Sequence, residues 1–141
     1  MKNLQNVVKA LFIGFVFSTV IVACSKDKDE PSTDESAASR IVGTYKGTMD
    51  VTDSDTDYFD AIIVITKESG NKVKIAPKSG EPYSQVTPKI VPIQAILGSD
   101  DAASEGPVGI LIYKAQEKSL KFLSKETASG DKTYSFEGTK Q

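Results

Sequence analysis

Apolar and polar residues alternate from residue 41 onward with a period of two. The positions on one face of the first segment are apolar or glycine: Ile41, Gly43, Tyr45, Gly47, Met49 and Val51. The positions between them are polar: Thr44, Lys46, Thr48 and Asp50. Because successive side chains of a strand point to opposite faces, this pattern predicts a half-buried β-strand over 41–51.

Further strand candidates follow along the chain. Residues 57–66 are apolar on both faces, which predicts a central strand. Residues 89–97 are also apolar, but Pro92 cannot donate to a ladder and therefore predicts an edge or bulged strand. The remaining candidates are 71–75, 108–115, 120–123 and 132–138, and 98–107 is expected to be an exposed loop. About seven to eight strands predict an all-β domain, a small antiparallel β-barrel with a β-sandwich as the alternative.

The N-terminal segment has a different pattern. Lys2 and Lys9 precede 13 uncharged residues, 10–22. A helix of that length spans about 20 Å, which is shorter than the hydrocarbon core of a bilayer, about 30 Å. A basic start, a short apolar stretch and a small residue at its end predict a signal peptide over 1–23.

The residues that close this segment, Ile21-Val22-Ala23-Cys24, resemble the bacterial lipobox. The resemblance implies that the Cys24 thiol is lipidated, as by palmitate, and that Cys24 becomes the mature N-terminus. Cys24 is the only cysteine of the chain, so lipidation leaves no thiol over. We expect a lipoprotein anchored to the outer membrane, with a signal peptide without lipidation as the alternative.

A cluster of charged residues follows the expected anchor Cys24 in the sequence: Lys26, Asp27, Lys28, Asp29 and Glu30. The cluster resembles the export signal of surface lipoproteins of the Bacteroidetes type, which implies display on the cell surface. The alternative is a solvated linker on a periplasm-facing anchor. Residues 24–39 lack large apolar side chains, so we expect the lipidated cysteine to be followed by a disordered tether. The β domain is then expected over 40–141.

The charge and the residue types narrow the range of functions. Two of the 17 basic residues leave with the leader, so 15 remain against 19 acidic residues, and nucleic-acid binding is not expected. The chain has no histidine, which removes imidazole catalysis and nitrogen ligands for zinc. We therefore expect no enzyme and no cofactor.

An acidic stretch contains Asp53, Asp55 and Asp57, spaced like the ligands of a calcium loop. Tyr58 stands where such a loop needs glycine, and Val64 stands where it needs the closing glutamate. We interpret the three carboxylates as a soluble turn between strands and expect no metal site.

Two short motifs at the ends of the β domain carry a family resemblance. They are Gly43-Thr44-Tyr45-Lys46-Gly47-Thr48 and Phe136-Glu137-Gly138-Thr139-Lys140. Together they resemble the calycin-like lipoproteins of the Bacteroidetes type, small antiparallel β-barrels whose function is undetermined. The chain departs from the lipocalins, because Tyr45 replaces their tryptophan and Arg40, the only arginine, precedes the first strand.

A barrel of this kind suggests two classes of function. The first is a binding module for a small apolar ligand or a glycan in the barrel mouth. Its candidate pocket residues are Tyr45, Tyr58, Tyr83 and Tyr113, although tyrosines also complete the edges of cores. The second is a structural or interaction protein of the cell envelope without a small-molecule ligand. Small residues lining an open lumen would favour the first, and a lumen filled by large apolar side chains would favour the second.

Overall fold

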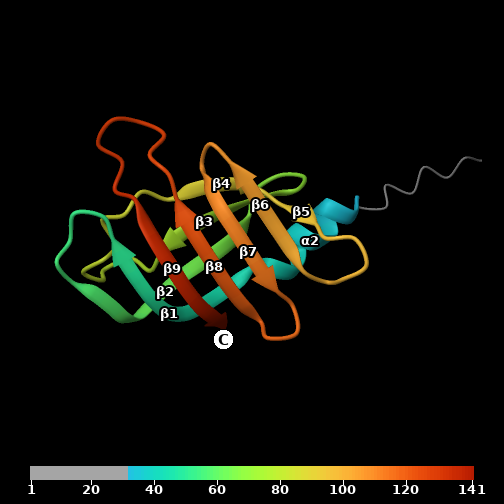
Figure 1. The fold of residues 1–141 in the computed structure, drawn as a ribbon, viewed down its shortest axis with the longest axis horizontal. Helices are drawn as coiled ribbons and strands as arrows, with labels where there is room; N and C mark the ends of the chain where they lie inside the picture. The colour runs from blue at the N-terminus through green and yellow to red at the C-terminus, as the bar shows by residue number, and fades with distance from the viewer. Residues whose placement is uncertain (1–31) are drawn as a thin grey trace, which may run out of the picture.

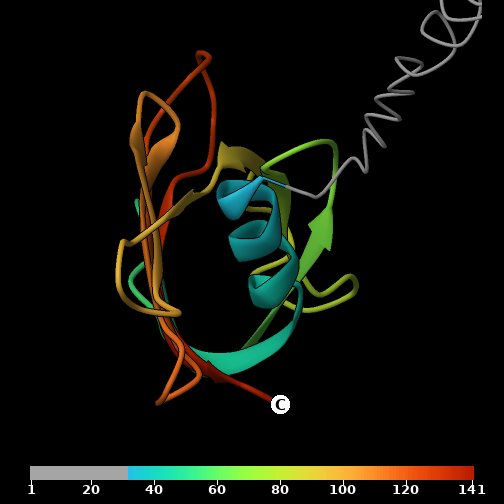
Figure 2. The ribbon, with the colours of Figure 1, turned by 90° about the vertical axis from the view of Figure 1, so that its right-hand side faces the viewer.

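The computed structural model describes residues 32–141, which form one antiparallel sheet of nine strands and one helix (Figure 1). The strands are β1 (Gly43–Val51), β2 (Asp57–Lys67), β3 (Lys72–Pro77), β4 (Lys89–Pro92), β5 (Gln94–Ala95), β6 (Ala102–Gly106), β7 (Gly109–Lys114), β8 (Ser119–Ser124) and β9 (Tyr134–Lys140). Their order in the sheet is β4-β3-β2-β1-β9-β8-β7-β6-β5. The sheet curls into a nearly closed barrel, which confirms the predicted all-β fold (Figure 2).

The two ends of the domain meet in the middle of the sheet. β1 and β9 pair antiparallel, with Tyr45 opposite Lys140 and Gly47 opposite Gly138. The two motifs that carry the family resemblance are therefore partners in one ladder. This pairing places the first and last strands side by side, as Figure 1 shows.

The edge strands β4 and β5 follow each other in sequence and lie at opposite ends of the strand order. Between them, the Ile93 amide donates to the Asn71 carbonyl and the Asn71 side chain donates to the Ile93 carbonyl, both at 2.9 Å. Pro92 ends β4, so the prediction of an edge strand at this proline is confirmed.

The predicted loop 98–107 is partly wrong, because residues 102–106 form β6. Ala102 and Ser104 are buried and alternate with more accessible positions, but small side chains give a weak strand signal. The full ladder with β7, from Ala102 opposite Tyr113 to Gly106 opposite Gly109, holds this segment in the sheet. Together with the two-residue strand β5, it raises the strand count to nine.

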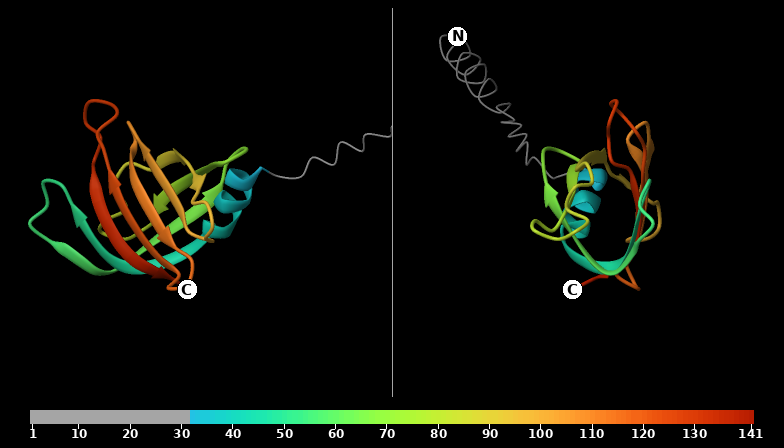
Figure 3. Two further views of the ribbon diagram at one scale, coloured as in Figure 1. Left: turned by 45° about the vertical axis from the view of Figure 1, so that its right-hand side comes forward. Right: turned by 90° about the vertical axis from the view of Figure 1, so that its left-hand side faces the viewer.

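The inward side chains of the strands form one contiguous apolar core. Its largest fully buried members include Tyr45, Met49, Ile63, Ile75, Leu111 and Phe122. On β1 the buried positions Tyr45, Met49 and Val51 belong to the apolar face that the period of two predicted. The loops between β1 and β2 and between β8 and β9 lie at the end of the barrel away from the helix (Figure 3).

The helix α2 (Thr33–Ile41) overturns part of the predicted tether. Ser32 caps its first turn by accepting a hydrogen bond from the Glu35 amide at 3.1 Å. Ala37, Ala38 and Ile41 are fully buried in the core, so the folded domain begins before residue 40. The prediction failed because two alanines and one isoleucine, spaced on one helical face, were too few to mark a buried helix. The other residues of the predicted tether up to 31, and the signal peptide, lie outside the described residues.

Both ends of α2 are bonded to the sheet. In its first turn the Asp34 carboxylate accepts from the Ala95 amide of β5 at 2.8 Å. At its last turn the Tyr45 hydroxyl donates to the Ile41 carbonyl at 2.8 Å, and the Lys140 ammonium donates to the Arg40 carbonyl at 2.9 Å. The two contacts at the last turn satisfy carbonyls that a helix end leaves without partners. Together with the Asp34 contact they hold α2 across the mouth of the barrel (Figure 2). Within residues 32–141, no helix is long and apolar enough to cross a membrane.

Candidate functional site

The four candidate pocket tyrosines lie in two separate pairs. Tyr45 and Tyr113 meet edge to face inside the barrel, with ring centroids 6.5 Å apart. Tyr58 and Tyr83 form a second edge-to-face pair at 5.3 Å. The structure therefore does not bring the four rings to one place.

Two of their hydroxyls have structural partners. Tyr45 donates to the end of α2, and burial raises the pKa of its phenol well above the usual range. The Tyr83 hydroxyl accepts a hydrogen bond from the Ile62 amide at 2.8 Å. Burial also raises the pKa of Tyr113. The phenols of Tyr45 and Tyr113 therefore remain protonated at neutral pH, and the buried rings of Tyr45, Tyr83 and Tyr113 act as parts of the core.

The three acidic residues of the stretch 53–57 are all exposed. Asp53 takes a left-handed conformation, with φ of 65°, in the loop after β1, and Asp57 begins β2. Such a conformation is typical of aspartate in turns. In the part of the chain that the structure describes, no group of three or more histidine, cysteine or acidic residues could hold a metal ion.

The predicted lipidation site and export signal lie outside the described residues. Cys24, Lys26, Asp27, Lys28, Asp29 and Glu30 all precede Ser32, where the described chain begins.

An apolar hollow lies on the outer face of the sheet, over β1, β9, β8 and β7. Its volume is about 470 Å³. Ile110 and Ile112 of β7 and Leu123 of β8 provide its outward-facing aliphatic side chains, and Ile110 lies directly opposite Leu123 in the ladder. Ile112 is 42% exposed and Leu123 is 51% exposed. We name Ile110, Ile112 and Leu123 the outer apolar patch.

Charged residues border the outer apolar patch on one side. The Lys121 ammonium lies 2.8 Å from the Glu137 carboxylate, and both side chains are exposed. The sequence predicts a strand over 108–115, but the prediction did not single out the residues that face outward. The signal was present in Ile110-Leu111-Ile112, because three consecutive aliphatic residues in a strand must place at least one on each face.

A polar hollow of about 670 Å³ lies between the β5–β6 loop and the β7–β8 hairpin. Its carboxylate Asp101 accepts from the Ala115 amide and from the Lys114 ammonium, each at 2.9 Å. These two contacts hold the pKa of Asp101 below its usual range. The carboxylate is thus charged and already hydrogen-bonded at neutral pH. This fits a structural role, in which it holds the loop, better than the role of a general acid.

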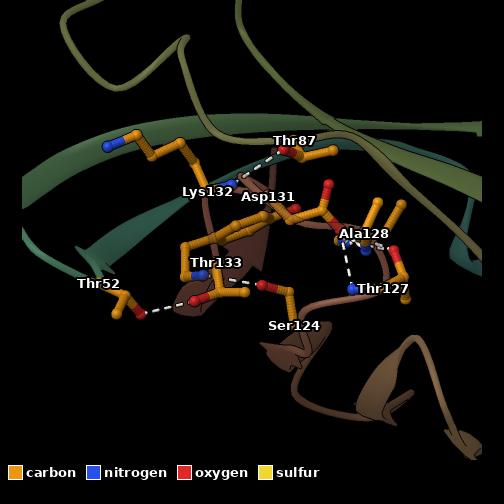
Figure 4. Close-up of polar contacts among 10 residues, drawn as sticks. Thr52, Thr87, Ser124, Thr127, Ala128, Asp131, Lys132 and Thr133 are labelled. Carbon is orange, nitrogen blue, oxygen red and sulfur yellow. Dashed lines mark hydrogen bonds and ion pairs between the residues drawn. The ribbon is translucent and has the colours of Figure 1, made fainter.

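A buried ion pair fastens the β8–β9 loop to the barrel. Lys89 of β4 is only 3% exposed, and its ammonium contacts the Asp131 carboxylate. Asp131 also accepts from the Thr127 hydroxyl at 2.7 Å and from the Thr127 amide at 2.9 Å (Figure 4). Lys89 and then Thr127 hold the pKa of Asp131 far below its usual range. Lys89, Thr127 and Asp131 are thus bonded to one another, so we assign the cluster a structural role.

Comparisons with known proteins give no relative for this chain. No family model, no curated protein and no solved structure matches it.

Proposed function

We propose that this protein is a calycin-like lipoprotein, anchored to the outer membrane through Cys24 and displayed on the cell surface, that works as an interaction protein of the envelope. The lipobox and the single cysteine support the anchor, and the charged residues 26–30 support display. The fold supports a binding role, because small barrels commonly serve as rigid supports for binding surfaces.

One observation carries the choice of an interaction protein over a ligand carrier. The inward side chains of the strands and of α2 pack into a single apolar core. Side chains thus occupy the space in which a hollow barrel would hold a ligand. Several strands also carry accessible apolar side chains on the outside of the sheet, and those of the outer apolar patch line a hollow. We propose that this patch receives apolar side chains of another envelope protein.

A small apolar ligand is the second candidate, and one observation favours it. The hollow of about 470 Å³ at the outer apolar patch lies within the range of small-molecule sites, about 300–1,000 Å³. The ligand would then lie against the outer face of the sheet and not in the barrel mouth.

Photo-crosslinking in intact cells tests the interaction. A photoreactive residue at Leu123 should give one adduct of defined mass, and Ile112→Lys should abolish it. Ile90 is the matched control position, because it is also exposed and lies on β4, outside the outer apolar patch. Equal adducts at both positions, or an adduct that survives Ile112→Lys, would contradict the proposal.

A titration of the purified protein with decanoate tests the second candidate. Saturable shifts in the methyl NMR signals of Ile110, Ile112 and Leu123, without any protein adduct in cells, would favour the small ligand. Shifts that do not saturate would argue against it.

Mass spectrometry of the mature N-terminus tests the anchor. Acyl chains on Cys24 are expected, and Cys24→Ser should carry none, because it removes the only thiol to which they could be attached. An unacylated mature protein in wild-type cells would refute the anchor.

Protease added to intact cells tests display. The wild-type domain should be cleaved, and a variant with alanine at Lys26, Asp27, Lys28, Asp29 and Glu30 should be protected. If both proteins are cleaved equally, the charged cluster is a linker only.

A further inference from the structure

The loop between β5 and β6 presents two apolar side chains to solvent. Leu97 is 95% exposed and Ile96 is 40% exposed. Two backbone hydrogen bonds hold this loop in shape: the Ile96 amide donates to the Asp101 carbonyl, and the Ser99 amide donates to the Ile96 carbonyl, each at 3.2 Å. Gly98 supplies the left-handed turn, with φ of +79°. An exposed leucine on an ordered turn keeps apolar surface in water, which is unfavourable, and burial against a partner surface would remove that cost.

This loop lies next to the point where the chain enters the domain. Ala95, two residues before Leu97, donates its amide to the Asp34 carboxylate in the first turn of α2. Figures 1 and 2 show the β5–β6 loop and the start of α2 at the same end of the barrel. The other exposed large apolar residues Phe59, Ile90, Ile112 and Leu123 belong to strands β2, β4, β7 and β8.

The length of chain before the domain limits how far this end can be from the membrane. Ser32 follows Cys24 by eight residues, which span at most about 29 Å when fully extended. As a flexible coil, eight residues span about 16 Å. A domain anchored at Cys24 therefore keeps the start of α2, and with it Leu97, close to the lipid surface.

The charges around the loop indicate which lipid surface it fits. Asp100 and Asp101 lie in the same loop, and Asp34 and Glu35 lie in the first turn of α2. Lys114 pairs with Asp101 and Lys67 pairs with Glu35, so acidic side chains remain in excess. Acidic neighbours are repelled by anionic headgroups, so contact through apolar side chains fits a zwitterionic surface better. The acidic side chains near the loop also argue against attachment of the loop to the membrane by charge alone.

We propose that Leu97 and Ile96 insert into the lipid interface of the membrane that holds the protein, as a second contact that orients the barrel. The proposal rests on the lipid anchor at Cys24 proposed above. Insertion of one turn to a depth of about 5–10 Å would place both side chains among the headgroups and upper acyl chains. It would also leave the outer apolar patch, on strands β7 and β8, free for a partner.

Site-specific fluorescence on the full-length lipoprotein tests this contact. Acylation consumes the only native thiol, so Leu97→Cys can be labelled uniquely with an environment-sensitive fluorophore. Leu123→Cys is the matched control, an exposed leucine on β8. Both proteins are reconstituted into phosphatidylcholine vesicles with and without doxyl-labelled lipid, and vesicle flotation reports anchoring separately.

For the label at 97 we expect a blue shift and loss of most emission with the doxyl quencher, whereas the label at 123 keeps its emission. Adding phosphatidylglycerol should not increase the quenching at 97. If the proteins float but the two labels behave alike, the loop contact is refuted and the anchor stands. Quenching at 97 only with anionic lipid also refutes the apolar contact. If the proteins do not float, the anchor fails and the loop proposal fails with it.

Discussion

Gly47 of β1 and Gly138 of β9 face each other directly across the ladder that joins the two ends of the domain. The backbones approach so closely that a Cβ on Gly47 would overlap the Glu137 carbonyl oxygen and the Gly138 Cα. A Cβ on Gly138 would lie 2.5 Å from the Lys46 carbonyl oxygen. Since these neighbours are backbone atoms, they cannot rotate away, and both positions require glycine.

Gly47→Ala should therefore destabilise the domain. Overpacking of this kind costs about 1–3 kcal/mol, and the backbone contact places this site at the upper end. Gly106→Ala is the matched control, because a Cβ on this strand glycine would meet nothing within 4 Å. Urea unfolding of residues 32–141 measures both. If the two variants are equally stable, the backbones of β1 and β9 can move apart to accept a Cβ at residue 47 without loss of stability.

The sequence revealed this ladder only in part. The period of two placed Tyr45, Gly47 and Met49 on one face of the first strand, which the burial of Tyr45 and Met49 confirms. The close approach of the backbones at Gly47 and Gly138 was not predicted, because a local pattern cannot name the partner strand. That information lies in the register between residues about 90 positions apart.

The candidate site was harder to predict than the fold. Tyrosine side chains can line a pocket, yet Tyr45 and Tyr113 lie in the core. The residues of the outer apolar patch are those of an apolar run that face outward. Which face of the strand is outward depends on how the whole sheet closes around the core. Helix α2 was missed for a similar reason, because its stability comes from tertiary contacts and not from its own sequence.

Tyr45 and Tyr134 offer a paired test of buried hydroxyl groups. Tyr45→Phe removes the donor to the Ile41 carbonyl and should cost about 1–3 kcal/mol, because that carbonyl stays buried. The buried Tyr134 hydroxyl makes no hydrogen bond with any residue of 32–141, so Tyr134→Phe should be neutral or stabilising. Thermal unfolding measures both. A loss of similar size in the two variants would mean that the bond to α2 contributes nothing.

The Lys89–Asp131 pair should be far more sensitive than the surface ion pairs. Asp131→Ala leaves a buried ammonium without its counter-charge and should lower Tm strongly, and the double variant with Lys89→Met should recover much of the loss. Glu137→Ala, which breaks the exposed pair with Lys121, should cost less than about 1 kcal/mol. A double variant less stable than Asp131→Ala would contradict this account.

Asp131 should also give the domain an acid-sensitive component of stability. Its pKa is lowered by Lys89 and Thr127 in the folded state, whereas in the unfolded chain it is about 3.9. The contribution is therefore fully present above that value and is lost as the pH falls toward the lowered folded pKa. The difference in Tm between wild type and Asp131→Asn should shrink progressively below about pH 4. A difference that stays constant from pH 7 to pH 2 would contradict the assignment.

Helix α2 should behave as part of the domain and not as tether. Removing residues 1–31 should leave stability unchanged, whereas removing 1–41 also deletes Ala37, Ala38 and Ile41 from the core. Loss of the buried Ile41 side chain alone costs about 2–3 kcal/mol, and the two alanine sites add to it.

The point variant Ala38→Asp, compared with Thr33→Asp at the exposed start of the helix, makes the same test without truncation. Circular dichroism and urea unfolding should show Ala38→Asp destabilised and Thr33→Asp close to wild type, because an aspartate in the first turn suits the helix dipole. If both truncated proteins unfold at the same urea concentration, α2 contributes nothing to the fold and the domain begins at β1.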